Sequence, residues 1–462
     1  MFHGMKKSDM KKRTPEEEKK NEETLKKLKV IQDQILKIKS DPKYDEKTMA
    51  FLFKAGALMP DYPTLWSLVK QLAEQFLASS PAESFDFLRK QITDISKIML
   101  KNPKSYLLWY HRLWCIIKAL DIEKEKKTPL SNSIIMEELK LTDKFLKKDS
   151  RNFHVWNYRV ELLTLISKYF NDSFSTFIND ELEYCLKMVK ENFSNFSAWH
   201  YRAKLIPIYF FFNKIQWNTK AALDYFANDL DMIKRAIYTD PKDQSPWNYH
   251  LWIIDNFSPI YIENINFDEK TNIVHIKYSN VFKLRSVIEI IGEGVEIVNK
   301  EEFSSTLSIK IPDNVKDKII IKNKILEDIN FDFDHLSLVT NKVCFTKQNL
   351  TLPSVEITKG DSFNYKIDMS NLPQFQIDFL KEQEKMIEEL IINSTDYFIE
   401  NAHYRLAQLY NIFYQIASVS SDEKEKAEKE EYKNKQIEKY KLLKEKSSRK
   451  NSMYEVILKS LL

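Results

Sequence analysis

One motif recurs along the first half of the chain, and a tryptophan stands at the centre of each copy. Successive tryptophans are separated by 43, 47, 43 and 48 residues. This period is typical of stacked helix pairs, in which each pair buries its apolar side against the next pair. The motif therefore predicts a helical repeat array on which any function is arranged. The positions are Trp66, in a weaker copy, and Trp109, Trp156, Trp199 and Trp247, in strong copies.

Each copy also indicates how its helices are joined and packed. A proline precedes two of the tryptophans, at Pro103 and Pro241, and predicts the end of the preceding helix. In three copies an arginine follows the tryptophan by three positions, so the two side chains share one helix face. The simplest role for both is packing, with the arginine reaching a carboxylate or carbonyl of the adjacent repeat. These pairs are Trp109 and Arg112, Trp156 and Arg159, and Trp199 and Arg202.

Composition argues against several classes of protein. The 71 Lys and Arg residues are balanced by 67 Asp and Glu residues, which argues against nucleic acid as a partner. Cys115, Cys185 and Cys344 lie too far apart for a zinc motif or a disulfide framework, and they favour a reducing compartment. The longest apolar run, residues 205–212, is interrupted by Pro207 and is too short to cross a bilayer. We expect a soluble cytoplasmic protein without stable membrane insertion.

Four regions follow from the changes in pattern. Apolar and polar residues alternate at 274–278 and 307–311, and this period of two predicts strands of a small antiparallel sandwich. Three of the 5 glycines also fall in that region, while the rest of the chain avoids them as a helical protein does. The expected domains are residues 1–44, an extension with an amphipathic helix; 45–259, helical repeats; 260–372, a β-sandwich insert; and 373–462, a C-terminal helical repeat region with a charged segment.

The repeated motif resembles the α-subunit repeat of protein prenyltransferases. The period fits that family, and the resemblance covers roughly residues 45–258. Within the family, the insert, the Met-Phe-His-Gly start and the copy at 240–247 (DPKDQSPW) most resemble the α subunits of type 2, or Rab, geranylgeranyltransferases. The insert corresponds to an immunoglobulin-like domain in those subunits. The copies that carry the resemblance are 102–112 (NPKSYLLWYHR), 151–159 (RNFHVWNYR) and 195–202 (NFSAWHYR).

This resemblance implies a mainly α fold, a right-handed α-α superhelix of helical hairpins wrapped around a β subunit. It also implies an enzyme that is catalytic only as a heterodimer and transfers a geranylgeranyl group from its diphosphate to C-terminal cysteines of Rab GTPases. A Rab escort protein presents the substrate in that system. Zinc is held by the partner β subunit, where it favours the attacking thiolate, and this chain supplies no metal ligand of its own.

The resemblance also implies roles for particular residues. Lys104 matches the lysine that reaches the diphosphate, where an ammonium can stabilise the charge on the leaving oxygen. Tyr106 is the second catalytic candidate, as a hydroxyl donor to the same group. His3, near the N-terminus, is a candidate regulatory ligand of the partner's zinc, although a solvated terminal residue is the simpler interpretation. The scaffold or subunit-interface candidates are Trp109, Arg112, Asn152, Trp156, Arg159, Trp199, Arg202 and Trp247.

Two alternatives remain open at this stage. One is the α subunit shared by farnesyltransferase and the type 1 geranylgeranyltransferase, against which the insert argues. The other is a non-catalytic helical-repeat scaffold that binds peptides. The tetratricopeptide class of scaffold needs a period of about 34 residues, which the spacing of 43 to 48 does not match.

Overall fold

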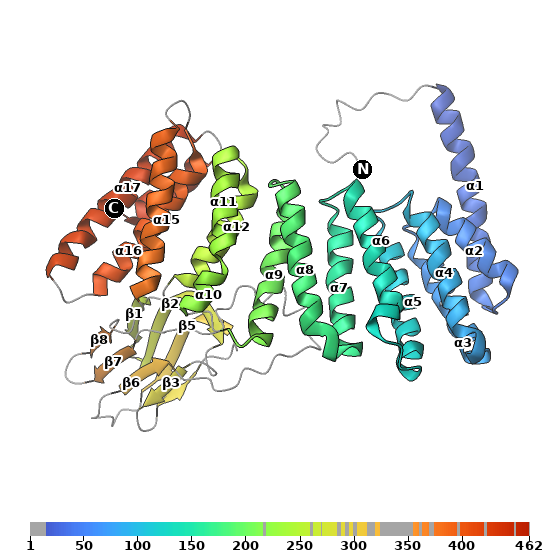
Figure 1. Ribbon diagram of the computed structural model, residues 1–462, viewed down its shortest axis with the longest axis horizontal. Coiled ribbons are helices and arrows are strands. Elements are labelled where there is room, and N and C mark those ends of the chain that lie inside the picture. Colours follow the sequence, from blue (N-terminus) through green and yellow to red (C-terminus); the bar gives the residue numbers. More distant parts are fainter. Residues whose placement is uncertain are drawn as a thin grey trace. The chain divides into compact units, whose positions relative to one another are not determined.

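The chain forms two compact units, Met1–Ser173 and Phe174–Leu462, in a computed structural model (Figure 1). Each unit is described by itself. The residues that the structure describes are 15–215, 219–258, 262–268, 270–283, 288–291, 295–298, 303–311, 319–323, 354–359, 363–368, 374–394, 398–419, 423–447 and 450–461.

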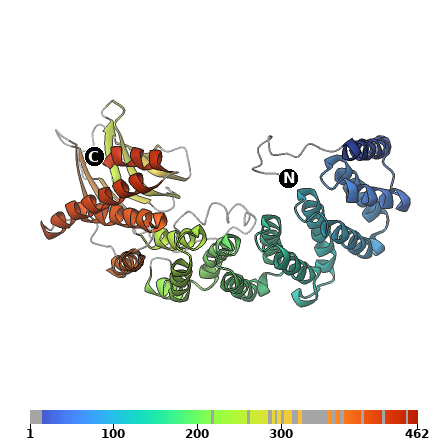
Figure 2. The same ribbon diagram turned by 90° about the horizontal axis from the view of Figure 1, so that it is seen from above.

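The first unit is helical throughout its described part. Its helices lie side by side in chain order in Figure 1, and Figure 2 shows most of them nearly end-on. Consecutive helices make the main contacts, as in α4 with α5 and α6 with α7, which is the packing expected of a repeat array. The helices are α1 (Pro15–Ser40), α2 (Glu46–Leu58), α3 (Pro63–Ser79), α4 (Ser84–Met99), α5 (Tyr106–Glu125), α6 (Ile134–Lys148) and α7 (Phe153–Tyr169), with short 3₁₀ turns at Pro81–Glu83 and Leu130–Asn132.

The second unit continues with helices on either side of a β-rich segment. Before the strands come α8 (Asn171–Glu191, which begins at the unit boundary), α9 (Phe196–Phe212), α10 (Lys220–Tyr225), α11 (Ala227–Thr239) and α12 (Gln244–Phe257). After the strands come α15 (Gln374–Asn393), α16 (Glu400–Val419), α17 (Glu423–Lys446) and α18 (Asn451–Leu461).

Side chains at the turns explain several helix starts. The side-chain oxygens of Asn152, Asn195 and Asp243 each accept a hydrogen bond from a backbone N–H in the first turn of α7, α9 and α12. These bonds satisfy donors that have no partner inside the helix. Asn152 was expected among the scaffold residues, and its capping bond ties it to the start of α7.

Among its described residues, the β-rich segment forms two antiparallel sheets of four strands each. In the first sheet, Val274 and Ile276 of β2 pair with Ile309 and Leu307 of β5, and all four side chains are fully buried. The predicted period of two is therefore confirmed for these strands. The strand order of the first sheet is β1 (Ile262–Asp268), β2 (Ile273–Lys283), β5 (Phe303–Lys310), β4 (Glu296–Ile297). The strand order of the second sheet is β3 (Ile288–Ile291), β6 (Ile319–Asn323), β7 (Ser354–Lys359), β8 (Phe363–Asp368).

The expected mainly helical fold with an antiparallel β segment is confirmed. The expected immunoglobulin-like fold of that segment is not confirmed. Antiparallel pairing of two sheets does not by itself establish an immunoglobulin-like sandwich, so that fold stays a prediction. The strand expected at 336–345 lies outside the described residues. The division at residues 44, 259 and 372 likewise stays a prediction.

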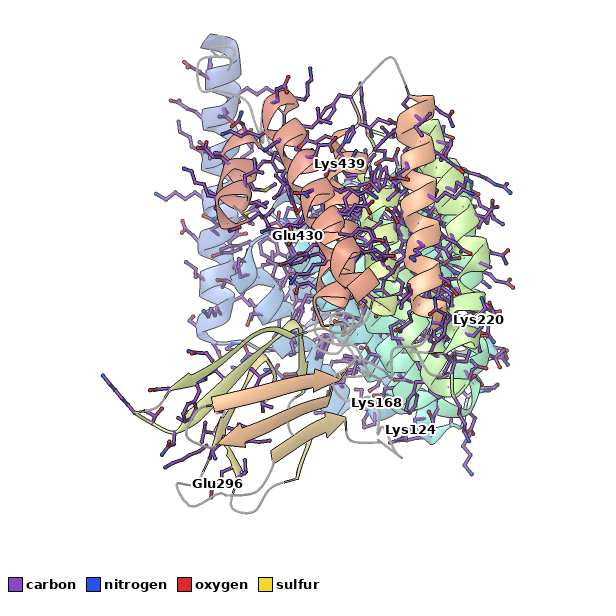
Figure 3. The ribbon with its side chains drawn as sticks, turned by 90° about the vertical axis from the view of Figure 1, so that its left-hand side faces the viewer. Lys124, Lys168, Lys220, Glu296, Glu430 and Lys439 are labelled. Carbon is purple, nitrogen blue, oxygen red and sulfur yellow. The ribbon has the colours of Figure 1, made fainter. Side chains whose placement is uncertain are left out.

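The charged segment near the C-terminus is a helix with one buried side. Figure 3 labels Glu430 and Lys439 on this helix, α17, whose sequence is almost wholly charged. Its Tyr440 and Leu443 nevertheless pack against Tyr454 of α18. The sequence left open whether this segment is an exposed helix or a mobile connector. Residues at steps of three and four build this side between the charges. Gln436, Tyr440 and Leu443 are buried, and Tyr432 is half-buried.

Candidate functional site

The motif tryptophans close the turns that precede their helices. In every copy the indole Nε1 donates a hydrogen bond to the backbone carbonyl six residues earlier, at 2.8 to 2.9 Å. The indole rings are at most 5% exposed. Each tryptophan therefore both fills the helix joint and donates a hydrogen bond to a turn carbonyl. The bonds are Trp66 to Pro60, Trp109 to Pro103, Trp156 to Ser150, Trp199 to Phe193 and Trp247 to Pro241.

Two of these turn carbonyls also bind the next copy. The Pro60 carbonyl accepts a second hydrogen bond from Ser105 Oγ at 3.3 Å, and the Pro103 carbonyl accepts one from Asn152 Nδ2 at 3.4 Å. The turn that contains Lys104 is therefore held from both neighbouring copies within the first unit.

The motif arginines are buried, and carboxylates face them. Arg112 is 3% exposed and donates two hydrogen bonds of 2.6 Å to the carboxylate of Glu138. Tyr158 donates a third bond to Glu138, also at 2.6 Å. Burial opposes the charge on Arg112, but Glu138 outweighs burial and raises the pKa of the guanidinium. The arrangement gives a buried charge the paired, hydrogen-bonded partner that it requires.

The same arrangement recurs in the second unit. Arg202 donates two bonds of 2.8 Å to Asp229, and Tyr249 donates one of 2.6 Å to the same carboxylate. In the first unit Arg159 binds Thr142 Oγ1 and Asp143 Oδ1, both at 2.7 Å. These contacts lie inside the chain, and a role of the arginines at a subunit interface stays a prediction.

Lys104 and Tyr106, the expected catalytic residues, lie at the surface. Lys104 is in the turn between α4 and α5, and its Nζ lies 3.2 Å from Asp149 Oδ2. The side chain of Lys104 is 68% exposed, so its ion pair with Asp149 is weak and open to exchange. Tyr106 is the first residue of α5 and is 65% exposed. A cation and a phenol hydroxyl therefore stand together, two residues apart, on a rigidly held turn.

His154 joins this pair, although the sequence did not single it out. Its ring centroid lies 4.3 Å from that of Tyr106, in an edge-on contact. The imidazole is 6% exposed. Burial first, and then the positive charge of Lys104, lowers the pKa of His154, so the ring is neutral near pH 7. Its signal in the sequence is its place two residues after the cap Asn152, in the first turn of α7.

We define the candidate site as Lys104, Tyr106, Asp149 and His154. An ammonium, a phenol and a neutral imidazole can together donate hydrogen bonds to a polyanion such as a diphosphate. Asp149 is the present partner of the cation, and a polyanion of higher charge would compete with it for Lys104. Groups of this kind can bind a polyanion and stabilise negative charge on it.

The described residues offer neither a metal-ligand cluster nor a helix that could span a membrane. Within those ranges, no group of three or more His, Cys, Asp or Glu side chains is arranged to hold a metal ion. Cys115 and Cys185 are buried thiols, while Cys344 and His3 lie outside the described residues. In the part of the chain that is described, no helix has the length and apolar character needed to span a bilayer.

Comparison with known families agrees with this geometry. The protein prenyltransferase alpha subunit repeat matches residues 88–119, 135–166, 178–208 and 226–257. Each match ends in the helix that contains one of the motif tryptophans, so the sequence family and the helical repeats coincide. The chain therefore contains four copies of the protein prenyltransferase alpha subunit repeat.

Several curated proteins that the chain resembles are α subunits of type 2 geranylgeranyl transferases. The geranylgeranyl transferase type-2 subunit alpha of Bos taurus is 28% identical over 46% of this chain and 35% of its own length. The same subunit of Dictyostelium discoideum is 28% identical over 65% of this chain and 85% of its own length. The Saccharomyces cerevisiae subunit is 26% identical over 43% and 55%. The chain thus aligns with about a third of the length of the mammalian relative, and all three of these relatives are type 2 α subunits.

The chain also matches solved structures. Candida albicans protein geranylgeranyltransferase-I complexed with GGPP aligns with a TM-score of 0.38 at 24% identity, over 50% of this chain and 68% of that chain. A score of this size is too low for a comparison of the two architectures.

Proposed function

We propose that this chain is the α subunit of a heterodimeric Rab geranylgeranyltransferase. The enzyme would transfer a geranylgeranyl group from its diphosphate to C-terminal cysteines of Rab GTPases presented by an escort protein. Support comes from the type 2 α subunits among its relatives. The observation that carries the assignment of the site is the exposed ammonium of Lys104 beside Tyr106 and His154.

The proposed role of these residues is to stabilise the leaving group. The cysteine sulfur bonds to the lipid carbon as the bond from that carbon to the diphosphate oxygen breaks, and negative charge builds on the oxygen. Lys104 would leave Asp149 for the diphosphate, because an exposed ion pair of about 0–1 kcal/mol exchanges readily for a more highly charged partner. Tyr106 would donate its hydroxyl proton as a hydrogen bond to the same group.

In this proposal, zinc is bound by a partner β subunit and not by this chain. The described residues of this chain offer no ligand set for it, and the resemblance assigns the metal to a β subunit. The proposed role of this chain is to bind the diphosphate. Its described residues would instead orient the diphosphate and hold the charge that develops on it.

The substrate assignment is tested by coexpressing the chain with a candidate β subunit. Lipid transfer is measured to an escort-bound Rab and, separately, to a peptide ending in a CaaX sequence. We expect transfer to the Rab alone. Transfer to the CaaX peptide would instead establish the α subunit shared by farnesyltransferase and the type 1 enzyme. A stable complex without transfer to either substrate would favour a non-catalytic scaffold.

The site assignment is tested with Lys104→Ala in the same heterodimer. We expect the single-turnover rate to fall by about 10- to 100-fold, because one donor to the developing charge is lost. Lys101→Ala is the matched control, since Lys101 is an exposed lysine of the same turn and should turn over normally. Size-exclusion chromatography should show that both variants still form heterodimers. An unchanged rate for Lys104→Ala would refute the role of this lysine.

A further inference from the structure

The last helical copy keeps the motif arginine but not its carboxylate. Residues 403–405 (His-Tyr-Arg) repeat the order of residues 200–202, and Arg405 in α16 is buried, with 7% of its surface exposed. Arg112 and Arg202 bind carboxylates 26 and 27 residues further along the chain. The residues 26 and 27 positions after Arg405 are Glu431 and Tyr432. Glu431 pairs with Lys435 at 2.7 Å on the exposed side of α17.

Arg405 therefore lacks the partner that its counterparts have. Its Nη1 donates one hydrogen bond of 2.6 Å to Gln408 Oε1, and its guanidinium lies 5.7 Å from the centre of the Tyr404 ring. Among the described residues, no carboxylate lies within ion-pair distance of it. Burial lowers the pKa of Arg405, and the more distant charge of Asp255 offsets this only in part. By contrast, carboxylates raise the pKa of Arg112 and Arg202.

A cavity occupies the space beside this guanidinium. It lies among α12, α16, α17 and α18 of the second unit and has a volume of about 350 Å³, which suits a small organic ligand. Arg405 and Gln436 supply polar groups to its wall, as do Asp255, Gln408 and Asn411. Gln436 is 4% exposed, and its Oε1 has no hydrogen-bond partner among the described residues. Much of the remaining wall is aliphatic, from Leu251, Ile254, Leu409, Ile412 and Ile457.

We propose that this cavity binds a small apolar carboxylate with an N–H group, and that the ligand carboxylate pairs with Arg405 in place of the missing side chain. A guanidinium presents two parallel N–H groups that match a carboxylate. The amide of Gln436 would take the ligand's N–H group, and the aliphatic wall would enclose its apolar body. An N-acylated apolar amino acid and the last residue of a peptide share this chemistry. The site is independent of the proposed prenyl transfer.

The test measures binding of N-acetyl-leucine to the full chain by isothermal titration calorimetry. N-acetyl-leucinamide has the same body without the charge and should bind at least about tenfold more weakly. Arg405→Gln should abolish binding of the acid, whereas Arg235→Gln, which alters an exposed arginine, should leave it unchanged. Asp255→Asn should strengthen binding, because it removes a negative charge that opposes the ligand.

Stability separates a ligand-binding arginine from a structural one. Because the described residues give Arg405 no carboxylate partner, Arg405→Gln should leave the unfolding temperature of the ligand-free chain unchanged or higher. Saturating N-acetyl-leucine should raise that temperature for the natural sequence and not for the variant. A large fall in the unfolding temperature of ligand-free Arg405→Gln would overturn the proposal. So would equal affinity for acid and amide, or no binding of either probe up to its solubility limit.

A peptide distinguishes the two sources of the ligand. A hexapeptide that ends in leucine is compared with N-acetyl-leucine, and its amidated form is the control. Tighter binding of the free-acid peptide would identify a protein C-terminus as the ligand, and equal binding would identify a small metabolite. Both results support the carboxylate site. Binding of the amidated peptide as tightly as the free acid would contradict it.

Discussion

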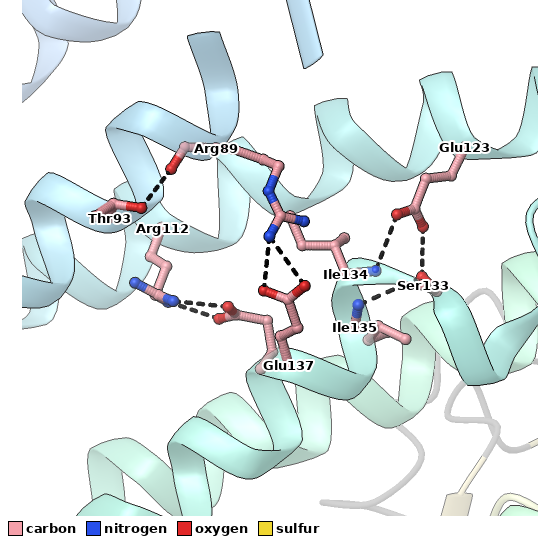
Figure 4. A network of polar contacts seen from close by, with 9 residues as sticks. Arg89, Thr93, Arg112, Glu123, Ser133, Ile134, Ile135 and Glu137 are labelled. Atoms are coloured by element: carbon pink, nitrogen blue, oxygen red, sulfur yellow. Dashed lines mark hydrogen bonds and ion pairs between the residues drawn. The ribbon is translucent and has the colours of Figure 1, made fainter. Parts of the chain in front are cut away.

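Two adjacent glutamates on α6 show how burial decides the value of an ion pair. Glu138 lies in the interior and pairs with Arg112, and both side chains are at most 3% exposed. Glu137 points outward and pairs with Arg89, whose side chain is 44% exposed. Figure 4 shows both pairs in one view, with the Glu137 pair nearer the Ser133 turn. The two carboxylates have the same chemistry and differ only in their access to water.

We expect Glu138→Gln to destabilise the chain by about 3 kcal/mol, because it leaves Arg112 buried without a counter-charge. Glu137→Gln is the control and should cost at most about 1 kcal/mol, since water replaces an exposed partner. Urea unfolding followed by tryptophan fluorescence measures both changes. Similar losses from the two variants would mean that the buried pair is not the stronger of the two.

The motif predicted the position of the arginine but not the residue that pairs with it. Tryptophan and arginine on one helix face indicated that the arginine would reach a neighbouring repeat. They did not indicate that Glu138 would receive Arg112, because several carboxylates on α6 lie at similar distances in the sequence. Likewise His154 stands in the quoted motif, but only the folded chain brings its ring against Tyr106.

At the scale of helices, the first repeat depends on a close approach between α2 and α3. Gly56 lies in the interior of α2, and the ring of Trp66 in α3 packs directly against it. A Cβ atom at this position would lie 2.8 Å from Trp66 Cζ2, which is shorter than any normal contact. The large ring is fixed by its hydrogen bond to the Pro60 carbonyl, so it has little freedom to move away.

Gly56→Ala is therefore expected to destabilise the chain by about 1–3 kcal/mol, through overpacking against Trp66. Helix propensity alone predicts the opposite sign, a gain of about 1 kcal/mol. Ala57→Gly is the control on the exposed side of the same helix and should cost about 1 kcal/mol through propensity only. Thermal unfolding by circular dichroism gives the two shifts. A higher unfolding temperature for Gly56→Ala would show that the ring moves aside.

At the scale of the whole molecule, buried histidines link stability to pH. Burial lowers the pKa of His111 to about 3 and the pKa values of His250 and His403 to about 4. The unfolded chain keeps values near 6.5 and so binds more protons in the window between. Stability is therefore complete above about pH 6.5 and is lost as the pH falls from there towards about 4.

We predict that the urea midpoint of the chain falls steadily as the pH is lowered from about 7.5 to about 5. His250→Gln should reduce this slope, because the variant removes one group that binds a proton only on unfolding while an amide can still face Gln383. The comparison is made on full-length chains in one buffer series. If the midpoint of the natural chain were constant over that range, its histidines would not be held neutral by burial.

The sequence alone determined the features that repeat locally. The period of the tryptophans predicted the helical array, and the alternation at 274–278 and 307–311 predicted strands that are present as β2 and β5. These patterns are readable because a helix or strand places neighbouring residues on fixed faces, whatever lies beyond them.

Only the tertiary structure decided which distant groups meet. It assigned Glu138 to Arg112 and Asp229 to Arg202, brought His154 to Tyr106, buried one side of the charged helix α17, and left Arg405 facing a cavity. Such pairings join residues that are tens of positions apart in the sequence. Their strength depends on burial and on the distance between charges, which no local pattern contains.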